Sequence, residues 1–302
     1  MKKFLFQLIL FLLLFSCIDF ALGTILHYGE SHAIGEQTQR SYYINNLSNE
    51  DILIFGSSRA LNHYNPRVFE DSLGLTAYNC GENETGIVCF YPKLNLIKER
   101  YVPKVIIYDV YLPDLLDSLR FYNIDYLKSL KTSYGKTFAV DSMFWRYDSL
   151  SRYKMLSKLY QYNSHFLDII LDNMTIISAL RTKMYYKGFY LLNKGQMRDE
   201  PFMNNKHHRY VYDIEKLHLI EKLILENKDL TRLYFVSSPV YGATNDEMFD
   251  PIKKICNKYN IPFLNYYCDT TFTLHKEYFV NHNHLNTNGA KVFSAKIVHQ
   301  IH

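Results

Sequence analysis

The sequence predicts an α/β fold in which helices cover both faces of a parallel sheet of about five strands. Three observations lead to this prediction. Short apolar runs alternate with longer segments of helical spacing. The apolar runs are continuous, which is typical of strands buried on both faces. Small and polar residues follow these runs, as expected at the carboxyl ends of parallel strands, where functional side chains usually lie.

The first half of the chain predicts three strands, over residues 52–55, 76–79 and 105–108. A helix is expected over 66–73, because Asn65-Pro66 is a typical helix start. A second helix is expected over 87–100, before Pro103.

The alternating pattern stops after Asp109 and resumes near residue 212. Residues 112 to about 208 are rich in Tyr, Leu, Lys and Ser with helical spacing and no convincing strand, so a helical insertion is expected there. The remainder predicts helix, strand, helix, strand and helix in turn, over 212–227, 232–236, 246–259, 262–265 and 287–301.

The N-terminus predicts a membrane anchor or a signal peptide over residues 1–23. Two lysines precede an apolar run from Phe4 to Leu22, about 19 residues, which is long enough to cross a bilayer. Lysines on this side place the N-terminus in the cytoplasm and the rest of the chain outside, on the periplasmic or cell-surface side. A retained anchor, cleavage after Gly23 and lipidation at Cys17 stay open. Residues 24–50 are expected to form a stalk leading to one domain over 51–302.

The composition excludes several classes of protein. A net charge of +4 with scattered basic residues argues against nucleic acid. No glycine-rich phosphate-binding motif is present, which argues against a nucleotide enzyme, and no cofactor is expected. The 27 tyrosines suit a wet interface such as a glycan cleft or a membrane surface, and packing in the core and at the surface is the alternative.

Serine and histidine are expected to meet at one rim of the sheet. Ser57 and Ser58 follow the first strand, and His282 and His284 precede the last helix. A serine hydroxyl becomes a nucleophile when a neighbouring base accepts its proton, and a helix N-terminus offers N–H groups to an oxyanion. The alternatives are that the serines only cap the next helix, or that the two histidines bind a metal. No acidic or cysteine ligand lies near them in sequence, so no metal is predicted.

Three blocks of the chain resemble the SGNH (GDSL-like) hydrolase superfamily, and more narrowly its membrane-anchored bacterial members with a Gly-Ser-Ser first block. They are Gly56-Ser57-Ser58-Arg59, Asn79-Cys80-Gly81 and Asn281-His282-Asn283-His284-Leu285-Asn286 followed by Gly289-Ala290. The resemblance covers residues 51–111 and 212–302. It implies a three-layer α/β/α, flavodoxin-like fold.

The resemblance assigns catalytic roles by position. It makes Ser58 the nucleophile, puts Ser57 in place of the usual Asp, and makes His284 the base. Asn281 stands where the family has an acid. An amide can accept a hydrogen bond from the ring, but it does not stabilise imidazolium as a carboxylate does.

The resemblance also implies an oxyanion hole. Its donors are the N–H of Ser58 and the N–H of Gly81 or of Glu84, which occupies the position of a family glycine. Asn83 is the substitute for a family asparagine that this chain lacks after the third strand. Arg59 and Tyr111 are expected to bind substrate, with pairing to a nearby acid as the alternative for Arg59.

The resemblance and the expected compartment together predict an extracytoplasmic serine esterase or O-acyltransferase. Its substrates would be acyl esters, above all acetyl esters, of a cell-envelope or extracellular polysaccharide. The first alternative is a catalytically inactive SGNH-like protein that binds a glycan or a partner protein. The second is an envelope assembly component that docks other membrane proteins.

Overall fold

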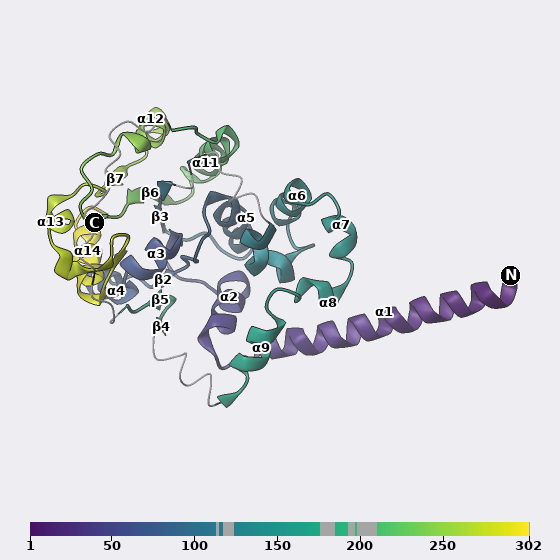
Figure 1. Ribbon diagram of the computed structural model, residues 1–302. Helices are drawn as coiled ribbons and strands as arrows, with labels where there is room; N and C mark the ends of the chain where they lie inside the picture. The colour runs from purple at the N-terminus through teal and green to yellow at the C-terminus, as the bar shows by residue number, and fades with distance from the viewer. Residues whose placement is uncertain (113–114, 117–123, 176–184, 193–196, 198–209, 302) are drawn as a thin grey trace. The chain divides into compact units, whose positions relative to one another are not determined.

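The computed structural model describes residues 1–112, 115–116, 124–175, 185–192, 197 and 210–301 (Figure 1). The chain forms two compact units. One contains Met1–Ser48 and Asn123–Lys183, and the other contains Asn49–Tyr122 and Met184–His302.

The second unit is built on a parallel sheet of five strands in the order β2-β1-β3-β6-β7. The strands are β1 (Ile52–Gly56), β2 (Ala77–Asn79), β3 (Val105–Asp109), β6 (Arg232–Ser237) and β7 (Phe263–Asn265). Taken in chain order this is the 2-1-3-4-5 order of flavodoxin-like folds, so the predicted fold class is confirmed. The order changes direction between β1 and β3, which is where such sheets bind their ligands.

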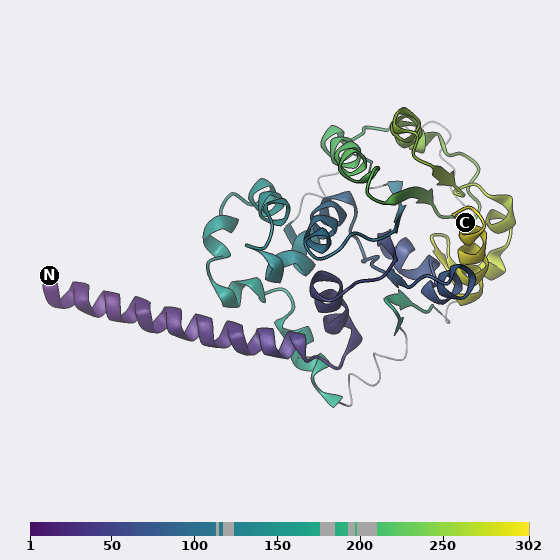
Figure 2. The same ribbon diagram turned by 180° about the vertical axis from the view of Figure 1, so that it is seen from behind.

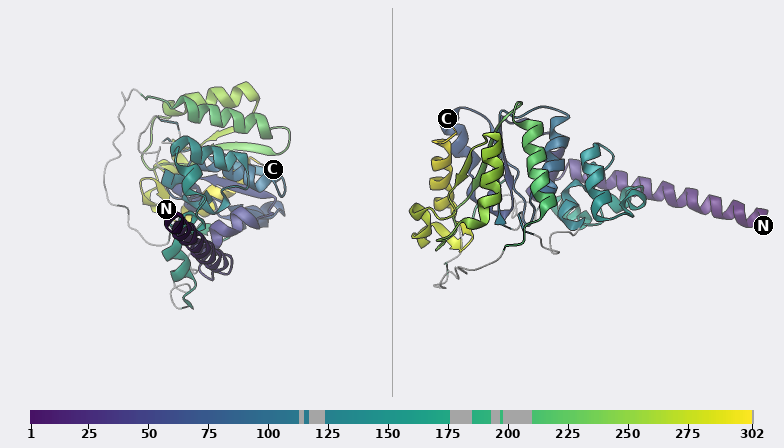
Figure 3. Two further views of the ribbon diagram at one scale, coloured as in Figure 1. Left: turned by 90° about the vertical axis from the view of Figure 1, so that its right-hand side faces the viewer. Right: turned by 90° about the horizontal axis from the view of Figure 1, so that it is seen from above.

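Helices cover both faces of this sheet (Figure 3). One face carries α3 (Ser58–His63), α4 (Pro66–Leu73) and α14 (Thr287–Val298), and the other carries α5 (Ile87–Lys98), α11 (Ile214–Asn227) and α12 (Asp250–Tyr259). Alternate side chains of β1 pack against the helices on opposite faces of the sheet. Ile52 and Ile54 belong to the cluster that includes Phe293 of α14, whereas Phe55 stacks on Phe90 of α5 at 4.2 Å. The strand is therefore buried on both sides, as its continuous apolar run predicted.

Two short hairpins lie outside the main sheet. One is formed by β8 (Phe279–Asn281) and β9 (His284–Leu285), which directly precede α14. Three short helical elements come earlier in this part of the chain: η4 (Glu247–Phe249), α13 (Thr270–Thr273) and η5 (Lys276–Tyr278).

The other hairpin, β4 (Tyr185–Tyr186) with β5 (Phe189–Tyr190), lies where the sequence predicted no strand, and that prediction was wrong there. Its turn residues Lys187 and Gly188 have φ of 45° and 78°, the left-handed pair that a two-residue hairpin requires.

The first unit is helical within its described residues. It contains α1 (Lys2–Ser31), α2 (Glu36–Asn46), η3 (Ile124–Ser133), α6 (Phe138–Tyr147), α7 (Ser151–Lys154), α8 (Lys158–Gln161) and α9 (Phe166–Asp172). By length and composition α1 could cross a membrane. The residues expected to form a stalk are largely helical, because α1 continues to Ser31 and α2 covers Glu36–Asn46. They are also packed, since α2 contacts α9 and η3.

The predicted insertion contributes helices η3 to α9 to this unit and the β4–β5 hairpin to the other. Residues 113–114, 117–123, 176–184, 193–196 and 198–209 of it lie outside the described part of the chain. The division into anchor, stalk and catalytic domain stays a prediction.

Candidate active site

The turn between β1 and α3 gives its two serines different environments. Gly56 has φ of 145°, and a Cβ there would lie 2.7 Å from the carbonyl oxygen of Asp109, so only glycine fits the turn. Ser57 is buried and is the N-cap of α3, its Oγ accepting the N–H of Arg59 at 3.4 Å. Ser58 begins the helix and is half-buried. Ser57 therefore caps the helix, as the alternative interpretation proposed, whereas Ser58 does not and lines a cleft described below.

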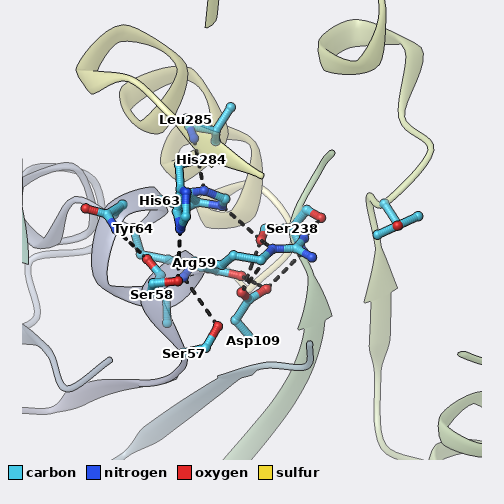
Figure 4. A network of polar contacts seen from close by, with 12 residues as sticks. Ser57, Ser58, Arg59, His63, Tyr64, Asp109, Ser238, His284 and Leu285 are labelled. Atoms are coloured by element: carbon cyan, nitrogen blue, oxygen red, sulfur yellow. Dashed lines mark hydrogen bonds and ion pairs between the residues drawn. The ribbon is translucent and has the colours of Figure 1, made fainter. Parts of the chain in front are cut away.

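Ser58 contacts His284, more than two hundred residues away in sequence. The Ser58 Oγ lies 2.9 Å from His284 Nε2 (Figure 4). His284 Nδ1 lies 3.0 Å from Asn281 Oδ1. Asn281 Oδ1 also accepts the backbone N–H groups of Asn283 and His284, both at 3.0 Å. Because those donors fix which end of the amide faces the ring, Nδ1 carries the proton. Nε2 then presents its lone pair to the serine hydroxyl, which is the tautomer that a general base needs.

The imidazole of His284 is held neutral. Burial lowers its pKa to about 4, and the nearby Arg59 guanidinium acts in the same direction. The Asn281 amide adds no negative charge to oppose these effects. The base is therefore unprotonated at neutral pH, but the imidazolium formed when it accepts a proton is poorly stabilised.

A cleft of about 700 Å³ opens beside this pair. That volume lies within the usual range for small-ligand sites. Its walls come from α3, the loop after β2, the hairpin β4–β5 with the residues that follow it, and the β8–β9 hairpin. The lining residues are Ser58, Leu61, Asn62, Asn83, Glu84, Tyr190, Leu192, Val280, Asn281 and His284.

Tyr190 and Leu192 are cleft residues that the sequence analysis missed. The signal was Lys187-Gly188 between aromatic pairs, a short-hairpin pattern. The hairpin is attached to β2, because the Lys187 carbonyl accepts the N–H of Asn79 at 2.9 Å.

The predicted oxyanion donors fall into two groups. The N–H of Ser58 belongs to the first residue of α3 and has no intrahelical acceptor. Asn83 and Glu84 line the cleft. Gly81 does not line it, and its N–H is donated to Asn79 Oδ1 at 3.0 Å. A Cβ at Gly81 would lie 2.5 Å from the Leu61 nitrogen, so this glycine is explained by the close approach of its loop to α3.

Arg59, predicted to bind substrate, is only 1% exposed and does not line the cleft. Its Nε lies 4.0 Å from Asp109 Oδ2 and donates to Ser238 Oγ at 3.0 Å, and its guanidinium lies 5.4 Å from the centre of the Tyr111 ring. The alternative, pairing with a nearby acid, describes this geometry. Tyr111 does not line the cleft either, and it contributes to the packing around Arg59.

A buried polar network links the nucleophile helix to the base hairpin (Figure 4). Ser238 Oγ donates to Asp109 Oδ2 at 3.1 Å. It therefore accepts from Nδ1 of His63, 2.9 Å away, because its single proton is used. The other ring nitrogen of His63 accepts the N–H of Leu285 at 3.0 Å. His63 ends the helix that Ser58 begins, so α3 contacts the hairpin at two points.

His63 and Asp109, two ionisable groups of this network, are fully buried. Burial holds the pKa of His63 well below its usual range, and the charge of Arg59 acts in the same direction, so the ring is neutral. Burial raises the pKa of Asp109, while Arg59 and the hydrogen bonds from Ser238 and Tyr64 act in the opposite direction.

His284 uses Nε2 for Ser58, which does not suit the metal alternative for His282 and His284. Among the residues that the structure describes, no three His, Cys, Asp or Glu side chains are grouped as a metal site.

No protein-family model matches the chain, and no curated protein matches it significantly in sequence. A solved structure from Streptococcus pneumonia, assigned provisionally as a platelet activating factor, is similar at 12% identity over 95% of this chain and 99% of that one, with a TM-score of 0.46. A Lactobacillus plantarum protein is similar at 12% identity over 85% and 98%, with a TM-score of 0.43.

A catalytic mutant of Axe2, an acetylxylan esterase from Geobacillus stearothermophilus, is similar at 13% identity over 82% of this chain and 92% of that one, with a TM-score of 0.40. At such low identity, the chemistry of this chain has to follow from its own side chains.

Proposed function

We propose that this protein is a serine esterase or O-acyltransferase with Ser58 as nucleophile and His284 as base. One observation carries the proposal: the Ser58 hydroxyl lies 2.9 Å from the unprotonated ring nitrogen of His284, at the wall of an open cleft. Asn281 orients the ring, and α3 presents the serine at its first turn. A nucleophile, a base and a group that orients the base are three of the parts that acyl transfer through a serine uses.

In the proposed reaction, Ser58 Oγ attacks the ester carbonyl carbon while Nε2 of His284 takes its proton. The carbonyl oxygen becomes an oxyanion that the Ser58 N–H and the Asn83 amide stabilise. Collapse of the intermediate expels the alcohol, which takes the proton from His284 and leaves an acyl-serine. Water or a sugar hydroxyl then attacks the acyl-serine and gives its proton to His284. A second collapse expels Ser58 Oγ, which takes that proton back from His284, so that both residues return to their starting state.

The proposed substrates are acetyl or other small acyl esters on a cell-envelope or extracellular polysaccharide. The cleft supports this class because it combines apolar walls at Leu61 and Leu192 with the aromatic ring of Tyr190 and the amides of Asn62 and Asn83. The proposed location is the extracytoplasmic side of a membrane, with α1 as anchor.

A second candidate is a catalytically inactive protein that binds a glycan through the same cleft. Asn281 in place of an acid favours it, and so does the Glu84 carboxylate at the wall, since a negative charge there opposes an oxyanion.

An assay of the purified full chain on p-nitrophenyl acetate and acetylated xylan tests the enzyme. We expect Ser58→Ala and His284→Ala each to lower turnover by about 10³-fold or more. Ser57→Ala is the matched control: it should keep activity and lose about 1 kcal/mol of stability with the cap. Turnover by Ser58→Ala equal to the wild type would refute the assignment. Glycan binding without turnover in any variant would favour the second candidate.

A further inference from the structure

The C-terminal half of α1 packs on α8 within the first unit, as both views in Figures 1 and 2 show. The Asp19 carboxylate accepts three hydrogen bonds at the start of α8: from the Ser157 hydroxyl at 2.5 Å and from the N–H groups of Lys158 and Leu159 at 2.8 and 3.2 Å. An acid inside an apolar helix is costly unless it is partnered. Here α8 supplies the partners.

The two helices also touch closely. A Cβ at Gly23 would lie 2.4 Å from the Lys158 Cβ, so the glycine allows the approach. The Lys158 ammonium lies 4.2 Å from the centre of the Phe20 ring. Cleavage after Gly23 would remove Asp19 and Phe20 and with them these contacts. The packing therefore favours a retained anchor over a cleaved signal peptide.

The depth of α8 follows from the length of α1. At about 1.5 Å per residue the apolar run from Phe4 to Leu22 spans roughly 28 Å, close to the thickness of a bilayer's hydrocarbon core. The helical turn of α1 from Asp19 to Gly23 then lies at the extracytoplasmic boundary of the bilayer. Because α8 is bound to that turn, it lies at the same depth.

The chain around α8 is exposed, apolar and basic. Tyr153 and Leu156 are 72% and 78% exposed, and Leu150 and Leu159 are also exposed. Three basic side chains alternate with them, Arg152, Lys154 and Lys158. Apolar residues interleaved with lysine and arginine are typical of segments that lie in the interface of an anionic membrane.

We propose that residues 150–159, the α7–α8 segment, contact lipid beside α1. Their apolar side chains lie among the outer ends of the acyl chains, and their basic side chains reach anionic headgroups. The proposal depends on α1 being the membrane anchor, and it adds a second contact that fixes the orientation of the first unit on the membrane.

The chain has a single tryptophan, Trp145, which makes fluorescence a clean test. In a Trp145→Phe background, Leu12→Trp places the reporter near the middle of the apolar run of α1, and Leu156→Trp places it on the α7–α8 segment. The full chain is reconstituted in vesicles of phosphatidylcholine and phosphatidylglycerol, with bromine either shallow or deep on the acyl chains. Leu156 is largely exposed, so its replacement should change stability little.

We expect deep bromines to quench the emission of the Leu12→Trp variant and shallow bromines to quench the emission of the Leu156→Trp variant. The emission of Leu156→Trp should also shift to shorter wavelength when the vesicles are present. Quenching in Leu12→Trp without quenching in Leu156→Trp would overturn the lipid contact and leave the anchor intact. Quenching in neither variant would refute the anchor itself, and with it this proposal.

Discussion

The ring of His63 accepts the backbone N–H of Leu285 at 3.0 Å, one residue beyond His284. Ser58 and His63 are the two ends of α3, so one six-residue helix contacts both the side chain of the proposed base and the backbone next to it. The hairpin that carries His284 is thereby held in register with the nucleophile. His63 is in this account a positioning residue.

Replacing His63 should therefore affect both stability and turnover. His63→Phe leaves the Leu285 N–H without a buried acceptor, at a cost of about 1–3 kcal/mol. Ser238 loses one hydrogen bond but keeps those with Asp109 and Arg59. His63→Gln keeps an acceptor for Leu285, and we expect it to recover part of kcat. Denaturant unfolding and kcat, measured on both variants, check this. Equal loss of kcat in the two variants would argue against a positioning role.

His63 and His284 together predict that the folded protein loses stability at acidic pH. Both His63 and His284 have folded-state pKa values below the ordinary value of 6.5, so the unfolded chain binds more protons as the pH falls. The contribution of His284 is complete above about pH 6.5 and should decrease by about 3 kcal/mol as the pH falls to its folded-state pKa of about 4. His63 should add to the decrease in the same direction. Urea unfolding across that range should show the decrease in the wild type and a smaller one in His63→Gln. A flat profile would contradict buried neutral rings.

Asn281→Asp should raise activity. A carboxylate at this position keeps the acceptor for the ring and stabilises imidazolium, which raises the pKa of His284 above its present value of about 4. We expect kcat to rise by about 10-fold to 10⁴-fold at neutral pH. The acid limb of the kcat/KM profile should move to higher pH, since the base now protonates earlier. Unchanged kcat with an unchanged profile would show that the ring does not act as base.

Glu84 offers a test of the cleft wall. Its φ of 58° lies in the left-handed region, which costs a non-glycine residue about 1 kcal/mol. Glu84→Gly relieves that strain and Glu84→Gln does not, but both remove the carboxylate. We expect both variants to raise kcat/KM on a neutral acetyl ester by several-fold, because a negative charge opposes the oxyanion. A loss of activity in both would instead indicate that the carboxylate binds substrate.

Gly188 tests the hairpin that closes the cleft. A Cβ there would lie 2.0 Å from the Asn79 carbonyl oxygen, whereas a Cβ at Gly74 would meet nothing within 4 Å. Both glycines have positive φ, 78° and 64°, so Gly74→Ala is a matched control for backbone strain alone. We expect Gly188→Ala to lower stability and activity clearly more than Gly74→Ala, by thermal unfolding and ester turnover. Equal effects would show that the hairpin does not need its contact with β2.

The sheet was predictable from sequence because its signals are local. Continuous apolar runs ending in Gly56 and Asp109 mark β1 and β3, and Asn65-Pro66 fixes the start of α4 at the residue observed. The place of Ser58 was predictable because it follows the carboxyl end of a parallel strand. His284 lies on a hairpin outside the sheet, and its role as base was predicted from the resemblance of its sequence block.

The remaining features depend on long-range contacts that no local pattern carries. His63 is the last residue of a short helix with an ordinary sequence, and its partner Leu285 lies 222 residues away. Arg59 was predicted to bind substrate because it lies next to the nucleophile in sequence. Its contacts with Asp109 and Ser238 are formed only in the folded chain. The tyrosines around Gly188 were interpreted as helical because aromatic residues suit both helix faces and strands.

The most direct test is to treat the full chain with a fluorophosphonate, which reacts with serines activated by a base, and to map the adduct by mass spectrometry. We expect one adduct on the peptide that contains Ser57 and Ser58, retained in Ser57→Ala and lost in Ser58→Ala and in His284→Ala. An adduct that persists in Ser58→Ala, or none in the wild type, would contradict this expectation.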